Sequence, residues 1–291
     1  MQVPAPFEYE HATSIEHAVS LLERLGPEAK LVAGGHSLFP MMKLRLARPE
    51  ALVDINDLTE LTAIRIENGE LRIGALVRHA ELLASPVAGE QFPILHDAER
   101  VIADPIVRNR GTVGGSLCQA DPSEDLSAAF AALKARVLIR GSGGERIISV
   151  RELHAGPYET VLGPAEILTE IRIGLRPGCG SAYQKVERRV GDYPVAAAGA
   201  AVWMQGNVIA DAGIGLTAVG APHFFAGSAE QAVIGREPND ETLDQAAQAA
   251  SADCHPVTDQ RGPADYKRHL AGELTRRALR RAIDRARGEG V

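Results

Sequence analysis

The first part of the chain has the apolar spacing of an amphipathic helix. Between residues 15 and 25, apolar side chains recur every three or four positions, which places them on one helical face. Thr13 and Glu16 have the spacing of a capping box at the start of this helix, and Gly26-Pro27 follows its end. The pattern therefore predicts a helix that buries one face against a core.

Short apolar runs around this helix predict strands. The runs at 30–33 and 51–55 have the length of buried strands, and the first leads directly into Gly34-Gly35. A helix followed by a strand and a glycine turn is typical of an α/β arrangement. The runs at 61–66 and 71–75 flank Asn68-Gly69, which favours a type I′ hairpin.

The middle of the chain mixes both periodicities. Helices are predicted at 79–83, 93–103 and 126–133, and strands at 137–139, 147–148 and 166–173. The last of these strands alternates apolar and polar residues, as a half-buried strand does. Turn residues dominate 104–115, so a long loop is expected there.

The last third has a different pattern. It predicts strands at 183–186, 196–204 and 208–218, followed by helices at 229–234, 241–252 and 264–285. The irregular segment 176–180 precedes this change, so we expect one domain at 1–177, with lobes of about 1–57 and 58–177, and a smaller domain at 178–291. Four arginines gather in the last helix, and they indicate either a solvated face or a docking surface for an acidic partner: Arg276, Arg277, Arg280 and Arg281.

Composition narrows the function classes. The chain has 291 residues, 45% of them hydrophobic and 24% charged, with a net charge of −7. This balance disfavours long disorder and nucleic-acid binding. The longest apolar stretch, 195–204, is shorter than the roughly 20 residues of a membrane helix, and no signal peptide is visible. We therefore expect a soluble, cytoplasmic protein.

The metal-ligating residue types are scattered. Cys118, Cys179 and Cys254 form no CxxC pair, and the histidines show neither HExxH nor HxH spacing. Such sparse thiols fit a reducing compartment and give the chain no iron–sulfur cluster of its own. Neither a metal site nor a catalytic residue is predicted.

Two glycine-containing segments are candidates for anion binding. Residues 34–37 (Gly-Gly-His-Ser) follow a strand, and residues 112–116 (Thr-Val-Gly-Gly-Ser) lie about eighty positions later. Glycine lets the backbone approach a ligand, and successive N–H groups attract a pyrophosphate, so both loops are expected to supply donors. Neither segment is a Walker A loop or a G-x-G-x-x-G fingerprint, and Phe39 breaks the nucleophile-elbow pattern. Ordinary turns remain the alternative.

Two charged segments have equally open interpretations. Residues 121–125 (Asp-Pro-Ser-Glu-Asp) suit either a helix cap or the hydroxyl groups of a ribose or ribityl chain. Residues 185–194 contain a lysine and a tyrosine that either lie on a solvated turn or reach a ligand between domains.

These motifs together resemble a known family. The segments 33–43, 108–115, 191–193 and 261–268 occur in the order and spacing of the FAD-binding medium subunits of molybdenum hydroxylases, the xanthine dehydrogenase and carbon monoxide dehydrogenase family. The sequence AGGHS with the PMMKLR continuation looks most like the carbon monoxide dehydrogenase branch. The resemblance implies an α+β fold. A two-lobed FAD-binding domain of the PCMH type would precede a smaller domain with a three-stranded antiparallel sheet and a helical bundle.

The resemblance also implies a cofactor site. The two glycine loops would wrap the FAD pyrophosphate, Asp125 would bond a cofactor hydroxyl, Leu168 and Lys185 would line the flavin end, and Tyr193 would cover one face of the ring. Many relatives carry Asn at the position of Ser116. The full set of implied cofactor-binding residues is Lys30, Leu31, Val32, Ala33, Gly34, Gly35, His36, Ser37, Leu38, Thr112, Gly114, Gly115, Ser116, Ala120, Asp121, Asp125, Leu168, Lys185, Asp192 and Tyr193.

The implied function is electron transfer. In the family, a large subunit holds molybdenum, a small subunit holds two [2Fe–2S] clusters, and the medium subunit passes their electrons through FAD to an external acceptor. The three chains form a heterotrimer that doubles to a heterohexamer. Two other classes stay open: a stand-alone FAD-dependent oxidoreductase, and a flavin-free binding module with the same fold.

Overall fold

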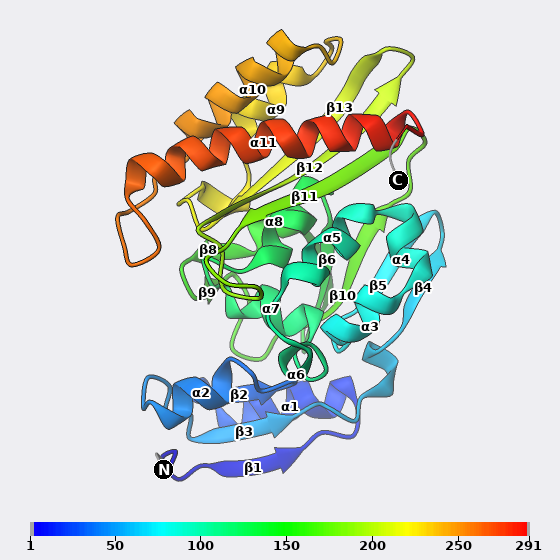
Figure 1. The fold of residues 1–291 in the computed structure, drawn as a ribbon. Coiled ribbons are helices and arrows are strands. Elements are labelled where there is room, and N and C mark those ends of the chain that lie inside the picture. The colour runs from blue at the N-terminus through cyan, green and yellow to red at the C-terminus, as the bar shows by residue number, and fades with distance from the viewer. Residues whose placement is uncertain (1–2, 290–291) are drawn as a thin grey trace.

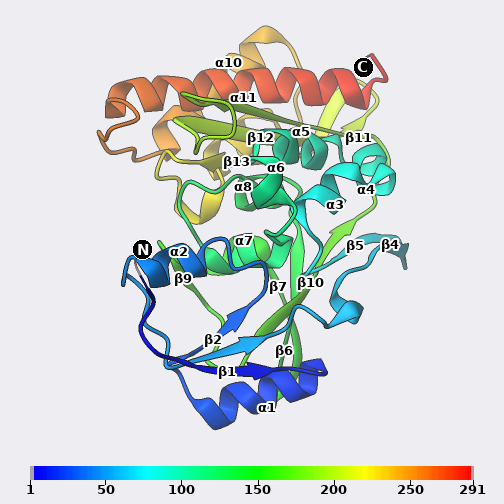
Figure 2. The ribbon, with the colours of Figure 1, turned by 60° about the horizontal axis from the view of Figure 1, so that its bottom comes forward.

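The computed structural model describes residues 3–289 and arranges them along one long direction. In Figure 1 and Figure 2 a small N-terminal lobe lies at one end, and the long helix α11 lies at the other. A five-stranded sheet with its helices lies between them. This middle part therefore contacts both ends of the molecule.

The N-terminal lobe is a small parallel α/β unit, as predicted. Its elements are β1 Glu8–His11, α1 Ile15–Leu25, β2 Ala29–Val32, α2 Leu38–Lys43 and β3 Ala51–Asp54, and β3 is the central strand. The helix is capped one residue later than the sequence suggests, because Ser14 is extended and its Oγ accepts from His17 N (3.0 Å). Thr13 instead contacts the His17 ring. The capping box predicted from Thr13 is therefore wrong.

The middle part is built on an antiparallel sheet in the order β4-β5-β10-β6-β7. Its strands are β4 Ile64–Glu67, β5 Glu70–Gly74, β6 Arg136–Gly141, β7 Gly144–Ser149 and β10 Ile167–Gly174. The predicted hairpin is confirmed, because Asn68 and Gly69 both have positive φ (53° and 73°). Strand β10 is central and almost wholly buried, so the prediction of a half-buried strand is wrong.

Helices cover this sheet and interrupt the expected loop at 104–115. They are α3 His79–Ala84, α4 Pro86–Gln91, α5 Pro93–Val101, α6 Pro105–Arg108, α7 Val113–Gln119 and α8 Asp125–Ala132. Short 3-10 helices and a small β pair complete this part: Thr59–Leu61, Val150–Glu152, β8 His154–Gly156 and β9 Glu159–Thr160. Asp104 caps α6 and Thr112 caps α7, so turn-forming residues here start helices.

The C-terminal part has the expected three antiparallel strands and three main helices. They are β11 Cys179–Val186, β12 Ala196–Gln205, β13 Val208–Thr217, α9 Gly227–Val233, α10 Asp240–Asp253 and α11 Ala264–Ala286, with a 3-10 helix at Pro222–Phe224. Glycines let helices approach both faces of this sheet. A Cβ on Gly215 would lie 1.9 Å from Ala128 O of α8, and one on Gly180 would lie 2.0 Å from Ala282 O of α11.

Carboxylates of this chain surround the arginines of α11. Arg276 pairs with Asp244, Arg277 with Glu273, Arg280 with Asp240 and Arg281 with Asp97. This pairing favours a locally neutralised, solvated face over the docking surface for an acidic partner.

Candidate cofactor site

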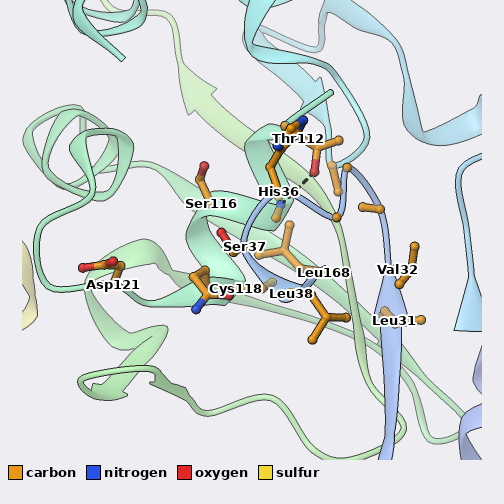
Figure 3. Close-up of a pocket in the computed structure, with 18 of the residues that line it drawn as sticks. Leu31, Val32, His36, Ser37, Leu38, Thr112, Ser116, Cys118, Asp121 and Leu168 are labelled. Carbon is orange, nitrogen blue, oxygen red and sulfur yellow. Dashed lines mark hydrogen bonds between the residues drawn. The ribbon is translucent and has the colours of Figure 1, made fainter. Parts of the chain in front are cut away.

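A cavity of about 750 Å³ opens between the N-terminal lobe and the middle part. Strand β2 and the loop after it form one wall, while α7, the start of α8 and β10 form the other (Figure 3). The turn 191–193 reaches the cavity from the C-terminal part. Its volume is within the range that holds cofactors in proteins, roughly 300–1,000 Å³.

The cavity brings together nearly all of the residues that the sequence suggested. Every one of them lines it except Ala120 and Lys185. Ala120 is buried at the end of α7 with left-handed backbone, and Lys185 points to a buried carboxylate. These two residues are therefore placed behind the cavity wall.

The loop between β2 and α2 presents unused backbone donors. In the part of the chain that the structure describes, no protein acceptor takes the N–H groups of residues 34–37. Gly35 has a φ of 74°, which turns the backbone there into the conformation that concave anion sites use. Four successive free amides fit a pyrophosphate, since all four can donate to one anion that enters from the open side of this loop.

The second glycine segment is built differently. It is the first turn of α7, and its amides are already used: Gly114 N donates to Ala75 O (2.9 Å), and Gly115 N donates to Thr112 Oγ1 (3.1 Å). Ser116 N donates to Thr112 O (3.0 Å). The prediction that both loops supply free donors is therefore wrong for this one. Gly115 instead leaves an open surface toward the cavity.

The two segments touch each other. A Cβ on Gly34 would lie 2.1 Å from Arg110 O, so only glycine permits this approach of the N-terminal lobe to the backbone before α7. Gln119 of α7 also reaches Met41 of α2, with Nε2 3.4 Å from Sδ. The cavity walls are therefore fixed relative to each other by direct contacts.

Asp125 carries a buried network at the start of α8. Its Oδ1 accepts from Tyr183 Oη (2.8 Å), and its Oδ2 accepts from Lys185 Nζ (3.0 Å). Burial raises the pKa of Asp125 to about 6, although the Lys185 ammonium opposes that shift. Lys185 also donates to Val101 O (2.9 Å). The carboxylate thus lines the cavity while the lysine holds it from behind.

The acidic segment before α8 both caps the helix and faces the cavity. Glu124 is the cap, and it accepts from Leu126 N (2.9 Å) and Ser127 N. Burial raises the pKa of Glu124 to about 7. The two interpretations of this segment are therefore compatible, because Glu124 and Asp121 also line the cavity.

The turn that carries Tyr193 is clamped at the cavity mouth. Asp192 lies 3.8 Å from Arg261 and 3.5 Å from Arg188. The Arg261 guanidinium lies 5.5 Å from the Tyr193 ring centre, within cation–π range. Gly191 has a φ of 78° and packs against Ala103 O, which a side chain would block. The aromatic ring is thereby held beside the cavity.

Sequence reasoning missed several cavity residues, among them His79, Cys118 and Gln119. The pattern shows His79 only as the start of a helix, and its contact with α7 depends on tertiary packing. Within residues 3–289, no three histidine, cysteine, aspartate or glutamate side chains gather to hold a metal ion. Over the same residues, no helix is both long and apolar enough to cross a membrane.

Comparisons with known proteins agree with this geometry. Residues 5–175 match the family described as FAD binding domain in molybdopterin dehydrogenase, and residues 181–282 match the CO dehydrogenase flavoprotein C-terminal domain. The carbon monoxide dehydrogenase medium chain of Afipia carboxidovorans is 41% identical over 98% of this chain and 99% of its own. The glyceraldehyde dehydrogenase medium chain of Sulfolobus acidocaldarius is 34% identical over 95% and 98%. The solved carbon monoxide dehydrogenase of Hydrogenophaga pseudoflava superimposes with a TM-score of 0.94, at 41% identity over 97% of this chain and 99% of that one.

Proposed function

This chain belongs to the FAD-binding medium subunits of the molybdenum hydroxylase family, and from that premise we propose that it is the electron-transfer subunit of a carbon monoxide dehydrogenase-like complex. It is an oxidoreductase subunit with FAD as its cofactor. The observation that carries the proposal is the row of four free amides at residues 34–37, in a cavity of cofactor size. Bound flavin would supply the redox chemistry that side chains lack.

In this proposal each wall of the cavity has one task. The amides of residues 34–37 hold the pyrophosphate, and the open surface at Gly115 lets it approach α7. Asp125 bonds a cofactor hydroxyl, while Leu168 and Tyr193 exclude water from the two sides of the flavin end. Lys185 acts through Asp125, since its ammonium group bonds that carboxylate.

The proposed partners are a small [2Fe–2S] subunit and a large molybdenum-cofactor subunit. Electrons would leave the substrate at molybdenum, pass through the clusters to FAD and continue to an external acceptor. The three scattered cysteines of this chain support separate cluster-bearing partners. We further propose a dimer of heterotrimers in the cytoplasm, whose reducing conditions suit free thiols.

The domain division at 177/178 belongs to the same proposal, with lobes of about 1–57 and 58–177. Strand β10 ends at Gly174 and β11 begins at Cys179, which supports a boundary between them.

The first test is the visible spectrum of the purified chain, followed by a thermal shift with added FAD. A flavin band, or stabilisation by FAD, is expected. Co-purification with two further chains separates the complex from a stand-alone oxidoreductase. Redox titration of the assembled complex then tests the electron path. A flavin that stayed oxidised while substrate reduced the clusters would contradict the proposed role.

A further inference from the structure

A chain of three hydrogen-bonded side chains leads from the cavity wall into the core. Ser116 Oγ lies 3.0 Å from His79 Nε2, and His79 Nδ1 lies 3.0 Å from both carboxylate oxygens of Glu99. Ser116 and His79 line the cavity, whereas Glu99 is 0% exposed. No role in the proposed function accounts for this buried ionisable pair.

The surroundings fix the imidazole ring in place. His79 begins α3, and its backbone N–H donates to Gly111 O (3.2 Å). The ring packs closely on Gly111, because a Cβ there would lie only 2.8 Å from His79 Cδ2. Of the described charged groups, Glu99 bonds the ring, while Glu124 of the α8 cap and Arg108 of α6 act on it through their charge alone. The histidine therefore has one strong partner on each nitrogen.

Glu99 favours the protonated histidine. Burial opposes the charge on the ring, but the Glu99 carboxylate outweighs it and raises the pKa of His79 above its usual range. Burial also raises the pKa of Glu99, and His79 offsets part of that rise. The pair thus retains a proton until the pH passes the raised pKa of His79.

That proton determines the direction of every hydrogen bond in the chain. With Nδ1 bonded to Glu99 and the pair protonated, Nε2 carries a hydrogen and donates to Ser116 Oγ. The serine hydroxyl then cannot donate to the ring, so its own hydrogen is free for an acceptor in the cavity. If the ring loses its proton, Nε2 becomes an acceptor and the hydroxyl turns inward.

We propose that Glu99 and His79 are positioning residues that hold the Ser116 hydroxyl as a hydrogen-bond donor to the pyrophosphate of bound FAD. The inference rests on the proposed function and deepens it. The anionic group is favoured because Ser116 lies next to the open surface at Gly115. The opposite wall holds the free amides of residues 34–37, and its loop touches the backbone before α7.

The experiment measures ligand affinity of the full chain stripped of flavin, by calorimetry with FAD, ADP and riboflavin. Ser116→Ala and Glu99→Gln are each expected to weaken FAD and ADP roughly tenfold, as loss of one charge-assisted bond does, and to leave riboflavin unchanged. The double variant should bind no more weakly than Ser116→Ala alone, because both changes remove the same bond. Glu230→Gln is the matched control, since this buried glutamate pairs with Arg151 outside the cavity.

Two further readouts separate positioning from mere packing. Nitrogen NMR of the His79 ring should show both nitrogens protonated at mildly acidic pH in the unaltered chain, and a lower pKa in Glu99→Gln. The affinity for ADP should fall as the pH rises through the pKa of His79. Glu124 lies on the same wall and its pKa is raised to about 7, so its titration also changes ADP affinity with pH. Subtracting the pH profile of Ser116→Ala from that of the unaltered chain leaves the part of the pH dependence that is due to Ser116.

Additive losses in the double variant, equal losses for riboflavin, or a ring with an unprotonated Nε2 below pH 6 would overturn the inference. Failure of the proposed function looks different, because the unaltered chain would then bind neither FAD nor ADP. In that case the NMR signals of the ring nitrogens still test the direction of the hydrogen bonds. Only a His79 ring protonated on both nitrogens is consistent with Nε2 donating to Ser116.

Discussion

Lys185 is the residue at which a structural role can be separated from a cofactor contact. The resemblance implied that it lines the flavin end, but its ammonium group lies 3.0 Å from Asp125, and the two side chains are 2% and 7% exposed. Replacing it by methionine keeps most of the aliphatic side chain and removes the ammonium group, with its bonds to Asp125 and Val101 O and its ion pair with Glu187. The Asp125 carboxylate then stays buried with Tyr183 as its remaining donor.

The expected cost follows from that burial. Removing one partner of a buried ion pair typically destabilises a protein by about 3–5 kcal/mol. We therefore expect Lys185→Met to lower the free energy of unfolding by that amount at pH 7. Combining it with Asp125→Asn removes the stranded charge and should recover most of the loss.

The pH dependence gives the sign of the effect. The folded pKa of Asp125, about 6, lies above the ordinary value of 3.8. A raised carboxyl pKa means that stability is greatest below the unfolded pKa and is lost as the pH rises through the folded one. Without the Lys185 ammonium, the pKa of Asp125 in the folded protein rises further. The free energy of unfolding of Lys185→Met should therefore be lowest at high pH and should increase on acidification toward pH 4.

The assay is urea unfolding followed by circular dichroism, at several pH values, with FAD affinity measured in parallel. A loss under 1 kcal/mol at pH 7, or no recovery in the double variant, would refute the reasoning. A large loss of FAD affinity with unchanged stability would instead indicate that Lys185 contacts the flavin end of the cofactor.

Three further changes test the cavity. Gly34→Ala should abolish FAD retention and lower the melting temperature, because its Cβ would meet Arg110 O at 2.1 Å, whereas Gly174→Ala has open space and should behave normally in both assays. Gly115→Val should abolish flavin absorbance, since a side chain there crowds the hydroxyl that caps α7 and fills the open surface; normal flavin content would remove this segment from the site. Cys118 should resist alkylation at pH 8 although it lines the cavity, because burial raises its pKa to about 12, and rapid modification would show that the thiol is more solvated than its surroundings indicate.

Local patterns predicted the elements of the fold well. The hairpin at Asn68-Gly69 follows from two residues that tolerate positive φ, and the run of small apolar residues predicted strand β12, which the structure shows to be buried on both faces. Helix α1 was found from its spacing, but its cap was misplaced by one residue, since Thr13 and Ser14 are equally good caps in isolation. The choice between them depends on the backbone that leads from β1.

The candidate site was predicted less completely, because its chemistry depends on contacts between distant segments. Lys185 and Tyr193 lie in one charged stretch, yet the tertiary fold sends the first into the core and leaves the second at the cavity mouth. His79 carries no motif, and only the tertiary pairing of Arg78 with Thr112, next to α7, brings it to Ser116. The spacing of residues in the sequence does not show where these side chains point in the fold.

The two glycine segments differ in whether their backbone N–H groups already have acceptors within the protein, a difference that composition does not reveal. Both contain a Gly-Gly pair, one just after β2 and the other in the first turn of α7, and both line the same cavity. At residues 113–116 the fold itself uses the amides, so glycine there serves close packing against Ala75 and an unobstructed surface. At residues 34–37 the fold leaves the amides without acceptors, and each of them must find an acceptor in a ligand or in water. The anion-binding capacity of the site therefore belongs mainly to the N-terminal lobe, and the Ser116 hydroxyl is the donor by which α7 can add to it.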